Sequence, residues 1–318
     1  MRPLPRWLRN GVTIVAALAV VTELVVGSGY MFLTRYEHRI KRTDLLSGVP
    51  STSKEGKAAG SMNFLVLGAD HDNAANYDER AYAIMIIHVR KDRKKATVLS
   101  IPRDSYVYIP RAGRWNGGPG KIDLAYAYGG PKLVARLLYG MSGIPLDGAF
   151  VLDFQGARKL VDAVGGVRVC LAEDVRSATS KRVWRKGCSR MDGETALAFM
   201  RDHKVSNNGS VDRSLDQQLI LKALLEKMSS SGTMTNPVAI NKLLSAASRA
   251  VTIDDRIRLS SLAVSLRDLR ASDLRFITVP SKEQIMAPGN AVPLDVVRSQ
   301  KLFAAIRTDN VDAWLAAN

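Results

Sequence analysis

The amino-acid sequence predicts an α/β fold, a three-layer α-β-α sandwich with a central mixed sheet, preceded by a single transmembrane helix. Three observations lead to this prediction. Short apolar runs typical of buried strands recur along the chain, amphipathic helical patterns alternate with them, and a long apolar stretch stands near the start. The composition agrees, because a chain of 318 residues that is 46% hydrophobic can form a sizeable core.

The start of the chain has the charge and hydropathy pattern of a membrane anchor. Residues 1–10 carry three arginines and no acid, and residues 11–33 are apolar almost throughout, with Glu23 as their only charged residue. Such a stretch can cross a bilayer, and Lys and Arg resist translocation, so we expect a cytoplasmic basic tail and a single-pass type II anchor in the cell membrane. A cleaved signal peptide is the alternative, although residues 25–29 match its cleavage site only loosely.

The remainder of the chain is expected to lie outside the cytoplasm. Residues 34–61 are polar, basic and rich in small side chains, which is typical of a linker, and residues 62–318 are expected to form the exported domain. Apolar runs predict strands at 63–68, 81–89, 96–101, 167–171 and 274–279. Helical spacing predicts helices at 124–141, divided by Gly129-Gly130-Pro131, and at 154–164, 192–200, 215–228, 237–251 and 259–269.

Both cysteines of the chain, Cys170 and Cys188, fall in the part predicted to be exported. An extracytoplasmic compartment permits disulfides, so we expect the two to be bonded, with a pair of buried thiols as the alternative. The basic, turn-rich stretch 174–191 is expected to form a hairpin or a similar excursion.

The charge balance bears on the partner. The chain has 46 Lys and Arg against 30 Asp and Glu, a formal charge of +16. Such a charge can indicate nucleic-acid binding, but the predicted topology argues against a nucleic-acid partner. Outside the membrane the available anions are lipid headgroups, pyrophosphate and wall polymers, which a basic surface attracts by the same Coulomb forces.

The clearest candidate for a functional site is Ser100-Ile101-Pro102-Arg103-Asp104. An apolar strand ends here in a proline that cannot extend the ladder, and an opposite charge pair follows at once. Open α/β sheets bind ligands at the carboxyl ends of their strands, so this pair is a candidate for ligand binding. The alternative is an ion pair that joins the loop to a neighbouring helix.

Further polar groups follow in an order that resembles the LytR-CpsA-Psr family. Its members show a strand ending Gly-x-Asp, then Ser-Ile-Pro-Arg-Asp, Lys-Ile-Asn-x-Ala-Tyr-x-x-Gly-Gly, Asp-x-Phe-x-Gly, Val-x-x-x-Gly-Gly-Val, Asp-Gly-x-x-Ala-Leu, Arg-x-Arg, and an Arg followed four residues later by Gln. The matching segments, all within 63–225, are Gly68-Ala69-Asp70, Ser100 to Asp104, Lys121 to Pro131, Asp153 to Gly156, Val161 to Val167, Asp192 to Leu197, Arg201, and Arg213 with Gln217.

The resemblance implies a phosphotransferase of cell-wall assembly. Such an enzyme moves a glycopolymer from a polyprenyl-pyrophosphate carrier to a hydroxyl of peptidoglycan, with Mg²⁺ (or Mn²⁺) as cofactor. Guanidinium groups suit the pyrophosphate oxygens, carboxylates suit the cation, and the lipid needs an apolar slot. The candidate catalytic residues are Arg103, Asp104, Arg201 and Arg213. Those for substrate binding are Arg80, Lys121, Gln217 and His203, and those for the metal are Asp70 and, next to it, Asp72, Asp78 and Glu79.

Four positions depart from the family pattern. Asp72 stands where an Arg is usual, Tyr82 replaces a carboxylate expected to hold Mg²⁺, His203 replaces the second Arg of Arg-x-Arg, and Asp216 replaces an Arg near the last motif. Two hypotheses follow: an active enzyme in which Asp72, Asp78 or Glu79 replaces the lost metal ligand, or a catalytically impaired scaffold that binds polyprenyl-linked glycan without transferring it.

A third class of function, a transcriptional attenuator-type regulator, is associated with the family name. The predicted cytoplasmic tail has about ten residues, which is too short for a DNA-reading motif such as a helix-turn-helix. The sequence therefore favours the wall-polymer hypotheses.

Overall fold

A computed structural model describes residues 39–51, 59–69, 80–177, 181–201, 209–230, 236–282 and 291–317, with the backbone alone for 209–213. The predicted tail 1–10 and anchor 11–33 lie outside these residues. Within the described ranges, no helix is long and apolar enough to cross a membrane.

The centre of the fold is a seven-stranded mixed sheet. Its strand order is β1-β12-β7-β2-β3-β4-β13. In that order the strands are Lys41–Thr43, Val251–Asp254, Gly148–Asp153, Met62–Ala69, Ala81–Val89, Ala96–Ser100 and Leu274–Thr278. β2 runs parallel to β7 and antiparallel to β3, and β4 runs antiparallel to β3 and parallel to β13. The predicted α/β fold with a central mixed sheet is confirmed.

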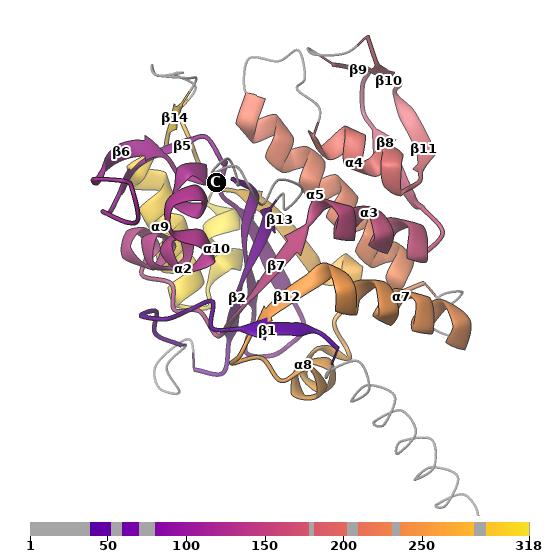
Figure 1. The fold of residues 1–318 in the computed structure, drawn as a ribbon, viewed down its shortest axis with the longest axis horizontal. Helices are drawn as coiled ribbons and strands as arrows, with labels where there is room; N and C mark the ends of the chain where they lie inside the picture. The colour runs from indigo at the N-terminus through magenta and orange to yellow at the C-terminus, as the bar shows by residue number, and fades with distance from the viewer. Residues whose placement is uncertain are drawn as a thin grey trace, which may run out of the picture.

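Helices cover both faces of this sheet (Figure 1). On one face lie α2 (Asp123–Ser142), α9 (Val296–Arg307) and α10 (Val311–Ala316), and on the other lie α3 (Phe154–Ala163), α4 (Gly193–Arg201), α5 (Gly209–Met228), α7 (Pro237–Ala250) and α8 (Leu259–Leu266). The pleat of β2 explains the two layers, because Leu65 and Leu67 join the first core while Phe64 packs on the opposite face. β2 thus supplies apolar side chains to both layers.

The segment before β2 belongs to the folded domain, although the sequence assigned residues 34–61 to a linker. Residues 41–43 form β1, and Leu45, Leu46 and Val49 are buried in the first core. A three-residue edge strand is too short to show a period of two, which is why its pattern is that of a loop.

The helix α2 carries a kink where the sequence predicted a break. Gly130 has a φ of 60° and Pro131 follows it, so the two predicted helices are joined by one non-helical residue. Only glycine adopts this backbone conformation without strain. The kink divides α2 into an N-terminal part that begins at Asp123 and a C-terminal part packed on the sheet.

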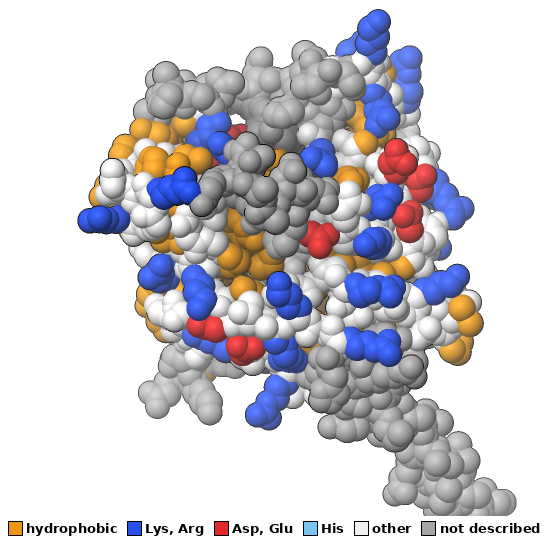
Figure 2. Space-filling view, viewed as in Figure 1, with side chains coloured by type: hydrophobic (Ala, Val, Ile, Leu, Met, Phe, Trp, Pro, Cys, Tyr) orange, Lys and Arg blue, Asp and Glu red, His pale blue; other side chains and the backbone are white. Residues whose placement is uncertain are grey.

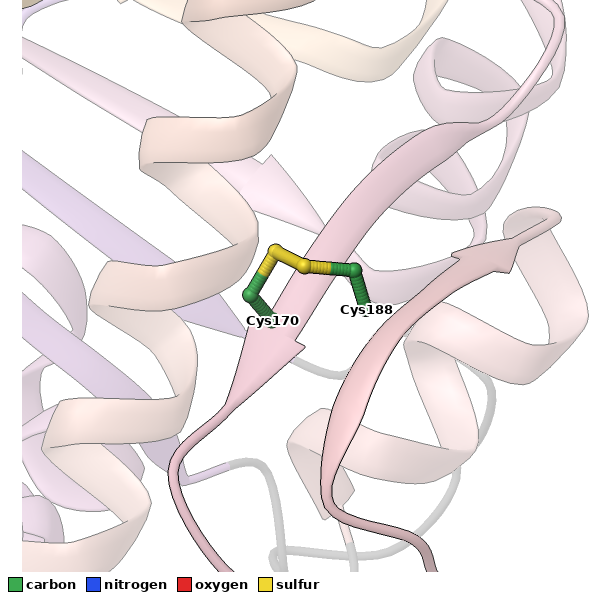
Figure 3. The surroundings of a disulfide bond; sticks show 2 residues. All are labelled: Cys170 and Cys188. Atoms are coloured by element: carbon green, nitrogen blue, oxygen red, sulfur yellow. A yellow bond between two sulfur atoms is a disulfide. The ribbon is translucent and has the colours of Figure 1, made fainter.

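Outside the central sheet, β8 (Val167–Leu171) and β11 (Gly187–Met191) form an antiparallel pair in which Cys170 lies opposite Cys188. A disulfide joins the two (Figure 3). The segment between them contains a second short pair, β9 (Val175–Arg176) and β10 (Val183–Trp184). A three-stranded sheet of β14 (Val292–Pro293), β5 (Ser105–Ile109) and β6 (Gly118–Lys121) follows β4, and the 3-10 helix η1 (Ala271–Asp273) precedes β13.

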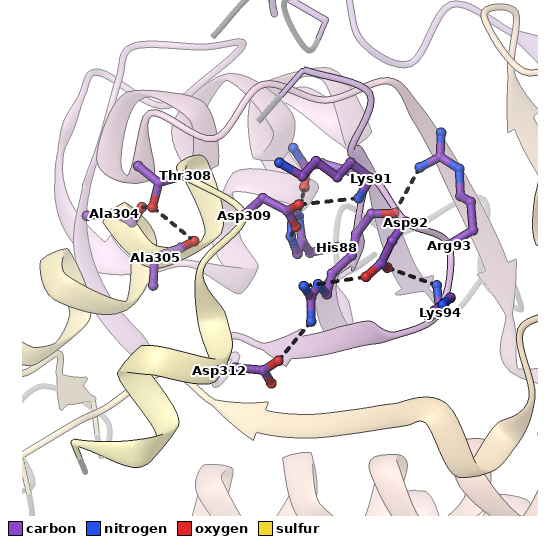
Figure 4. A network of polar contacts seen from close by, with 12 residues as sticks. His88, Lys91, Asp92, Arg93, Lys94, Ala304, Ala305, Thr308, Asp309 and Asp312 are labelled. Carbon is purple, nitrogen blue, oxygen red and sulfur yellow. Dashed lines mark hydrogen bonds and ion pairs between the residues drawn. The ribbon is translucent and has the colours of Figure 1, made fainter. Parts of the chain in front are cut away.

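A buried histidine ties the C-terminal helices to the sheet (Figure 4). The ring of His88 in β3 lies 2.7 Å from Asn63 Oδ1 through Nδ1 and 3.0 Å from Asp309 Oδ1 through Nε2. The backbone N–H of Lys91 also donates to Asp309. Burial lowers the pKa of His88, and Asp309 opposes this effect.

Candidate functional site

Three strand ends meet at one edge of the central sheet. Because β2, β3 and β4 alternate in direction, the last residues of β2 and β4 lie at the same edge as the first residues of β3. Ile101 to Asp104 follow β4 there, and the backbone N–H of Ser105 donates to the carbonyl of Pro102 and closes the turn. The edge therefore places Arg103 next to Arg80, which immediately precedes β3.

Both arginines converge on Asp123, the first residue of α2. Asp123 Oδ2 lies 2.9 Å from Arg103 Nη2 and 3.6 Å from Arg80 Nη1, and its side chain is completely buried. Burial raises the pKa of the Asp123 carboxyl, while the positive charges of Arg103 and Arg80 oppose the rise. The backbone N–H of Asp123 donates to the carbonyl of Arg103, which joins the two segments a second time.

A second ion pair lies beside the first. Lys121 Nζ donates to Asp104 Oδ1 over 2.9 Å, and Arg103 Nε lies 4.0 Å from the same oxygen. The sequence left open whether Arg103 and Asp104 bind a ligand or join a loop to a helix, and the structure shows that both are paired with residues of the β6–α2 segment. The side chain of Asp104 is almost fully buried, which suits positioning of the two cations better than proton transfer.

Aromatic rings extend the site from Arg103 to Arg201. The guanidinium carbon of Arg103 lies 4.5 Å from the centre of the Tyr82 ring, and that ring lies 5.0 Å from the ring of Phe154. The guanidinium carbon of Arg201, the last residue of α4, lies 5.2 Å from the centre of the Phe154 ring. The side chain of Gln217 donates to the carbonyl of Tyr82 over 3.0 Å. The structure thus brings together six predicted site residues: Arg80, Arg103, Asp104, Lys121, Arg201 and Gln217.

Two polar contacts at this edge were not predicted. Gln218 Nε2 donates to Ser100 Oγ over 2.8 Å and to Thr278 Oγ1 over 3.2 Å, which fixes α5 on the ends of β4 and β13. Asp123 lies in a predicted motif but was not among the candidate site residues. The signal was present, because the family motif Lys-Ile-Asn reads Lys121-Ile122-Asp123 here, a change from an amide to a carboxylate.

The metal candidates Asp70, Asp72, Asp78 and Glu79 lie outside the described residues, as do His203 and the side chain of Arg213. In the described part of the chain, no group of three or more His, Cys, Asp or Glu side chains could hold a metal ion. The two carboxylates of the site, Asp104 and Asp123, each face cationic side chains. The described residues alone therefore do not fit a divalent cation.

Comparison with protein families matches residues 29–305 to the LytR_cpsA_psr family. The cell wall biosynthesis protein LcpA of Corynebacterium glutamicum is 27% identical over 306 residues, which cover 84% of this chain and 59% of LcpA. The polyisoprenyl-teichoic acid–peptidoglycan teichoic acid transferase TagV of Bacillus subtilis is 30% identical over 201 residues, which cover 62% of this chain and 50% of TagV. This chain thus spans little more than half the length of either relative.

Among solved structures, the LytR-Csp2A-Psr enzyme from Actinomyces oris superposes with a TM-score of 0.67 at 23% identity, covering 84% of this chain and 96% of that one. This likeness concerns the fold: the same central sheet and helical layers recur in a chain of largely different sequence.

Proposed function

Because the chain belongs to the LytR-CpsA-Psr family, we propose that it transfers a glycopolymer from a polyprenyl-pyrophosphate carrier to peptidoglycan during cell-wall assembly. The observation that supports this most directly is the convergence of Arg80, Arg103 and Lys121 on one edge of the sheet, with Arg201 reaching the same edge through two rings. Relatives that carry the name of a teichoic acid transferase add support.

The charge of the site suits a pyrophosphate. Four described cationic side chains lie there, Arg80, Arg103, Lys121 and Arg201, and cationic groups suit the oxygens of an anionic ligand. Arg103 Nε is buried and has no hydrogen-bond partner within the described ranges, which leaves one guanidinium donor for a phosphate oxygen. We use the name phosphate clamp for Arg80, Arg103 and Arg201. On the face drawn in Figure 2, Lys and Arg side chains are more common than those of Asp and Glu.

We propose that the lipid binds on the face of the sheet that carries α3, α4, α5 and α7. On that face of the sheet the apolar side chains form two separate clusters, one under α3, α4, α5 and α7 and one under α8. Two side chains of β7 belong to different clusters: Leu152 packs in the first and Phe150 in the second. Both side chains are half-buried. We propose that a polyprenyl chain lies across this junction, where apolar surface is incompletely covered.

In the proposed reaction, an acceptor hydroxyl of peptidoglycan attacks the glycan-bearing phosphorus. A new phosphorus–oxygen bond forms, the bond to polyprenyl phosphate breaks, and the hydroxyl proton leaves to solvent. The clamp binds and orients the phosphate oxygens and stabilises the charge that develops on the leaving group. Asp123 holds Arg80 and Arg103 in place, and Asp104 holds Lys121.

Mg²⁺ remains a proposed cofactor, with Asp70 as its first candidate ligand. A divalent cation would neutralise charge on the bridging and leaving oxygens when bound. Removal of divalent cations should lower transfer, and Mn²⁺ should restore it in place of Mg²⁺.

A catalytically impaired binder is the second candidate function. The observation that favours it is Tyr82, whose ring occupies the place of an expected carboxylate and contacts Arg103. Such a protein would bind the lipid-linked glycan through the same clamp without transferring it.

We further propose that the protein is a single-pass type II membrane protein with its domain outside the cytoplasm. The basic residues before the apolar stretch 11–33 support this topology. The disulfide between Cys170 and Cys188 supports an oxidising compartment. In that position the domain has access to membrane lipid and to peptidoglycan.

The experiment that tests the function is transfer of a synthetic polyprenyl-pyrophosphate glycan to peptidoglycan oligomers by the full chain in detergent micelles. We expect product with the wild-type chain and none with Arg103→Ala. Arg267→Ala is a matched control, because that side chain is 73% exposed at the end of α8 and pairs with Asp268. Binding of the carrier without product would favour the impaired binder, and equal product from Arg103→Ala would exclude the proposed clamp.

A further inference from the structure

Arg103 is held from two directions that use different parts of its side chain. Asp123 accepts a hydrogen bond from Nη2 over 2.9 Å, and the Tyr82 ring lies under the guanidinium carbon at 4.5 Å. A guanidinium is planar, with its donors in the plane and its faces free to stack, so the two contacts do not compete. Together they define both the position and the plane of the group.

The ring contact continues beyond Arg103. Tyr82 packs on Phe154 at 5.0 Å, and Phe154 in turn lies 5.2 Å from the guanidinium carbon of Arg201. These four side chains come from β3, the loop after β4, α3 and α4. The strand that carries Tyr82 is itself tied to α5 through the bond from Gln217 to the carbonyl of Tyr82. A line of π contacts therefore connects two arginines of the clamp through the ends of separate elements.

We propose that Tyr82 is a positioning residue of the phosphate clamp, setting the plane of Arg103 and linking it through Phe154 to Arg201. The inference rests on the proposed function, because the clamp is defined by it. A ring provides this support without adding negative charge. The only carboxylate within hydrogen-bond distance of Arg103 in the described part of the chain is Asp123, which lies on the α2 side. The face toward Tyr82 and Phe154 thus keeps the positive charge that an anionic ligand requires.

The competing explanation is that Asp123 alone fixes Arg103 and that Tyr82 only fills space against Phe154. Both explanations predict that loss of the ring leaves a gap. Two substitutions distinguish the explanations. Tyr82→Phe keeps the face of the ring and loses only the hydroxyl, whereas Tyr82→Leu keeps apolar volume and loses the π face. A positioning role requires Phe to preserve anion binding and Leu to weaken it.

The experiment is a calorimetric titration of the full chain in detergent micelles with inorganic pyrophosphate. We expect Arg103→Ala to abolish binding, Tyr82→Phe to bind within about two-fold of wild type, and Tyr82→Leu to bind roughly ten-fold more weakly, the loss that a desolvated cation–π contact of about 1–2 kcal/mol corresponds to. Tyr108→Leu is the matched control, because Tyr108 in β5 is 68% exposed, and it should bind as wild type does.

The outcomes separate the inference from the proposed function. If Arg103→Ala loses binding while Tyr82→Leu retains it, the inference is wrong and the clamp stands. If the wild-type chain does not bind pyrophosphate, or Arg103→Ala binds as well as wild type, the clamp is wrong and the inference with it. Thermal unfolding checks that each variant folds. Should Tyr82→Leu fail to fold, Tyr82→Met takes its place, since a flexible unbranched chain adapts to the gap.

Discussion

Gly193, the second residue of the Asp192-Gly193 motif, is a position where the structure predicts a large penalty for one added methyl group. It begins α4 and lies against α3, and its backbone N–H donates to Asp162 Oδ1 over 2.8 Å. A Cβ at this position would press against the carbonyl oxygen of Arg158 and lie 2.7 Å from Asp162 Oδ2. Atoms in favourable van der Waals contact are about 3.5 Å or more apart, so α4 must move away from α3.

The cost of Gly193→Ala follows from two opposing effects. Overpacking costs about 1–3 kcal/mol, and the upper part of that range applies because the obstructing atom is backbone. Alanine in a helix recovers about 0.5–1 kcal/mol relative to glycine. We therefore expect the free energy of unfolding to fall by about 2 kcal/mol, and the Tm to fall by about 4–8 °C in a domain of this size.

Thermal unfolding followed by circular dichroism measures this shift. Gly140→Ala is the control, because Gly140 lies in α2 and a Cβ there would meet no atom within 4 Å. That variant should be slightly more stable than wild type. The packing argument fails if Gly193→Ala melts at the wild-type temperature, or if both variants shift by the same amount in the same direction.

Three further predictions concern stability. Burial lowers the pKa of His88 from 6.5, so the unfolded chain binds more protons than the folded chain just below pH 6.5. The free energy of unfolding, measured by denaturation at a series of pH values, should therefore fall as the pH drops through this window. The same series should show a flatter pH dependence for His88→Asn. Asp309→Ala should lower the free energy of unfolding by about 1–3 kcal/mol, measured by urea denaturation, because it leaves His88 Nε2 buried without its acceptor. Cys188→Ser should cost about 3 kcal/mol, and a reducing agent should produce the same shift in the wild-type chain, whereas no shift would contradict a disulfide between Cys170 and Cys188.

The two longest strands were predictable from the sequence, whereas the six-residue β7 in the interior of the sheet and the three-residue β1 were not predicted. The run 63–68 lies within β2, and 81–89 coincides with β3, because strands buried on both faces are apolar at nearly every position. β1 and the buried leucines after it were assigned to a linker, since three residues carry too little pattern. Residues 41–43 form a strand because they pair with β12, and the local sequence does not predict this pairing.

The candidate site was partly predictable for a related reason. Arg80, Arg103 and Lys121 stand out as charges beside apolar runs, and the structure gathers them at one edge. The role of Asp123 depends on the fold. The loop after β4 lies next to the start of α2, and this contact places Asp123 between two arginines. Tyr82 belongs to the same class, since a strand aromatic most often packs in a core.

The pairing of β1 with β12 bears on how the protein is made. Arg42 Nη1 donates to the carbonyl of Ile257, 215 residues further along the chain, so this edge of the sheet forms only after synthesis has passed β12 and Ile257. Contacts between segments so distant in sequence form slowly, because a long loop must close first. Until then, β7 is an open edge, exposed to any extended chain nearby during folding. A folding helper that acts on the emerging chain would therefore be needed longest at the open edge of β7.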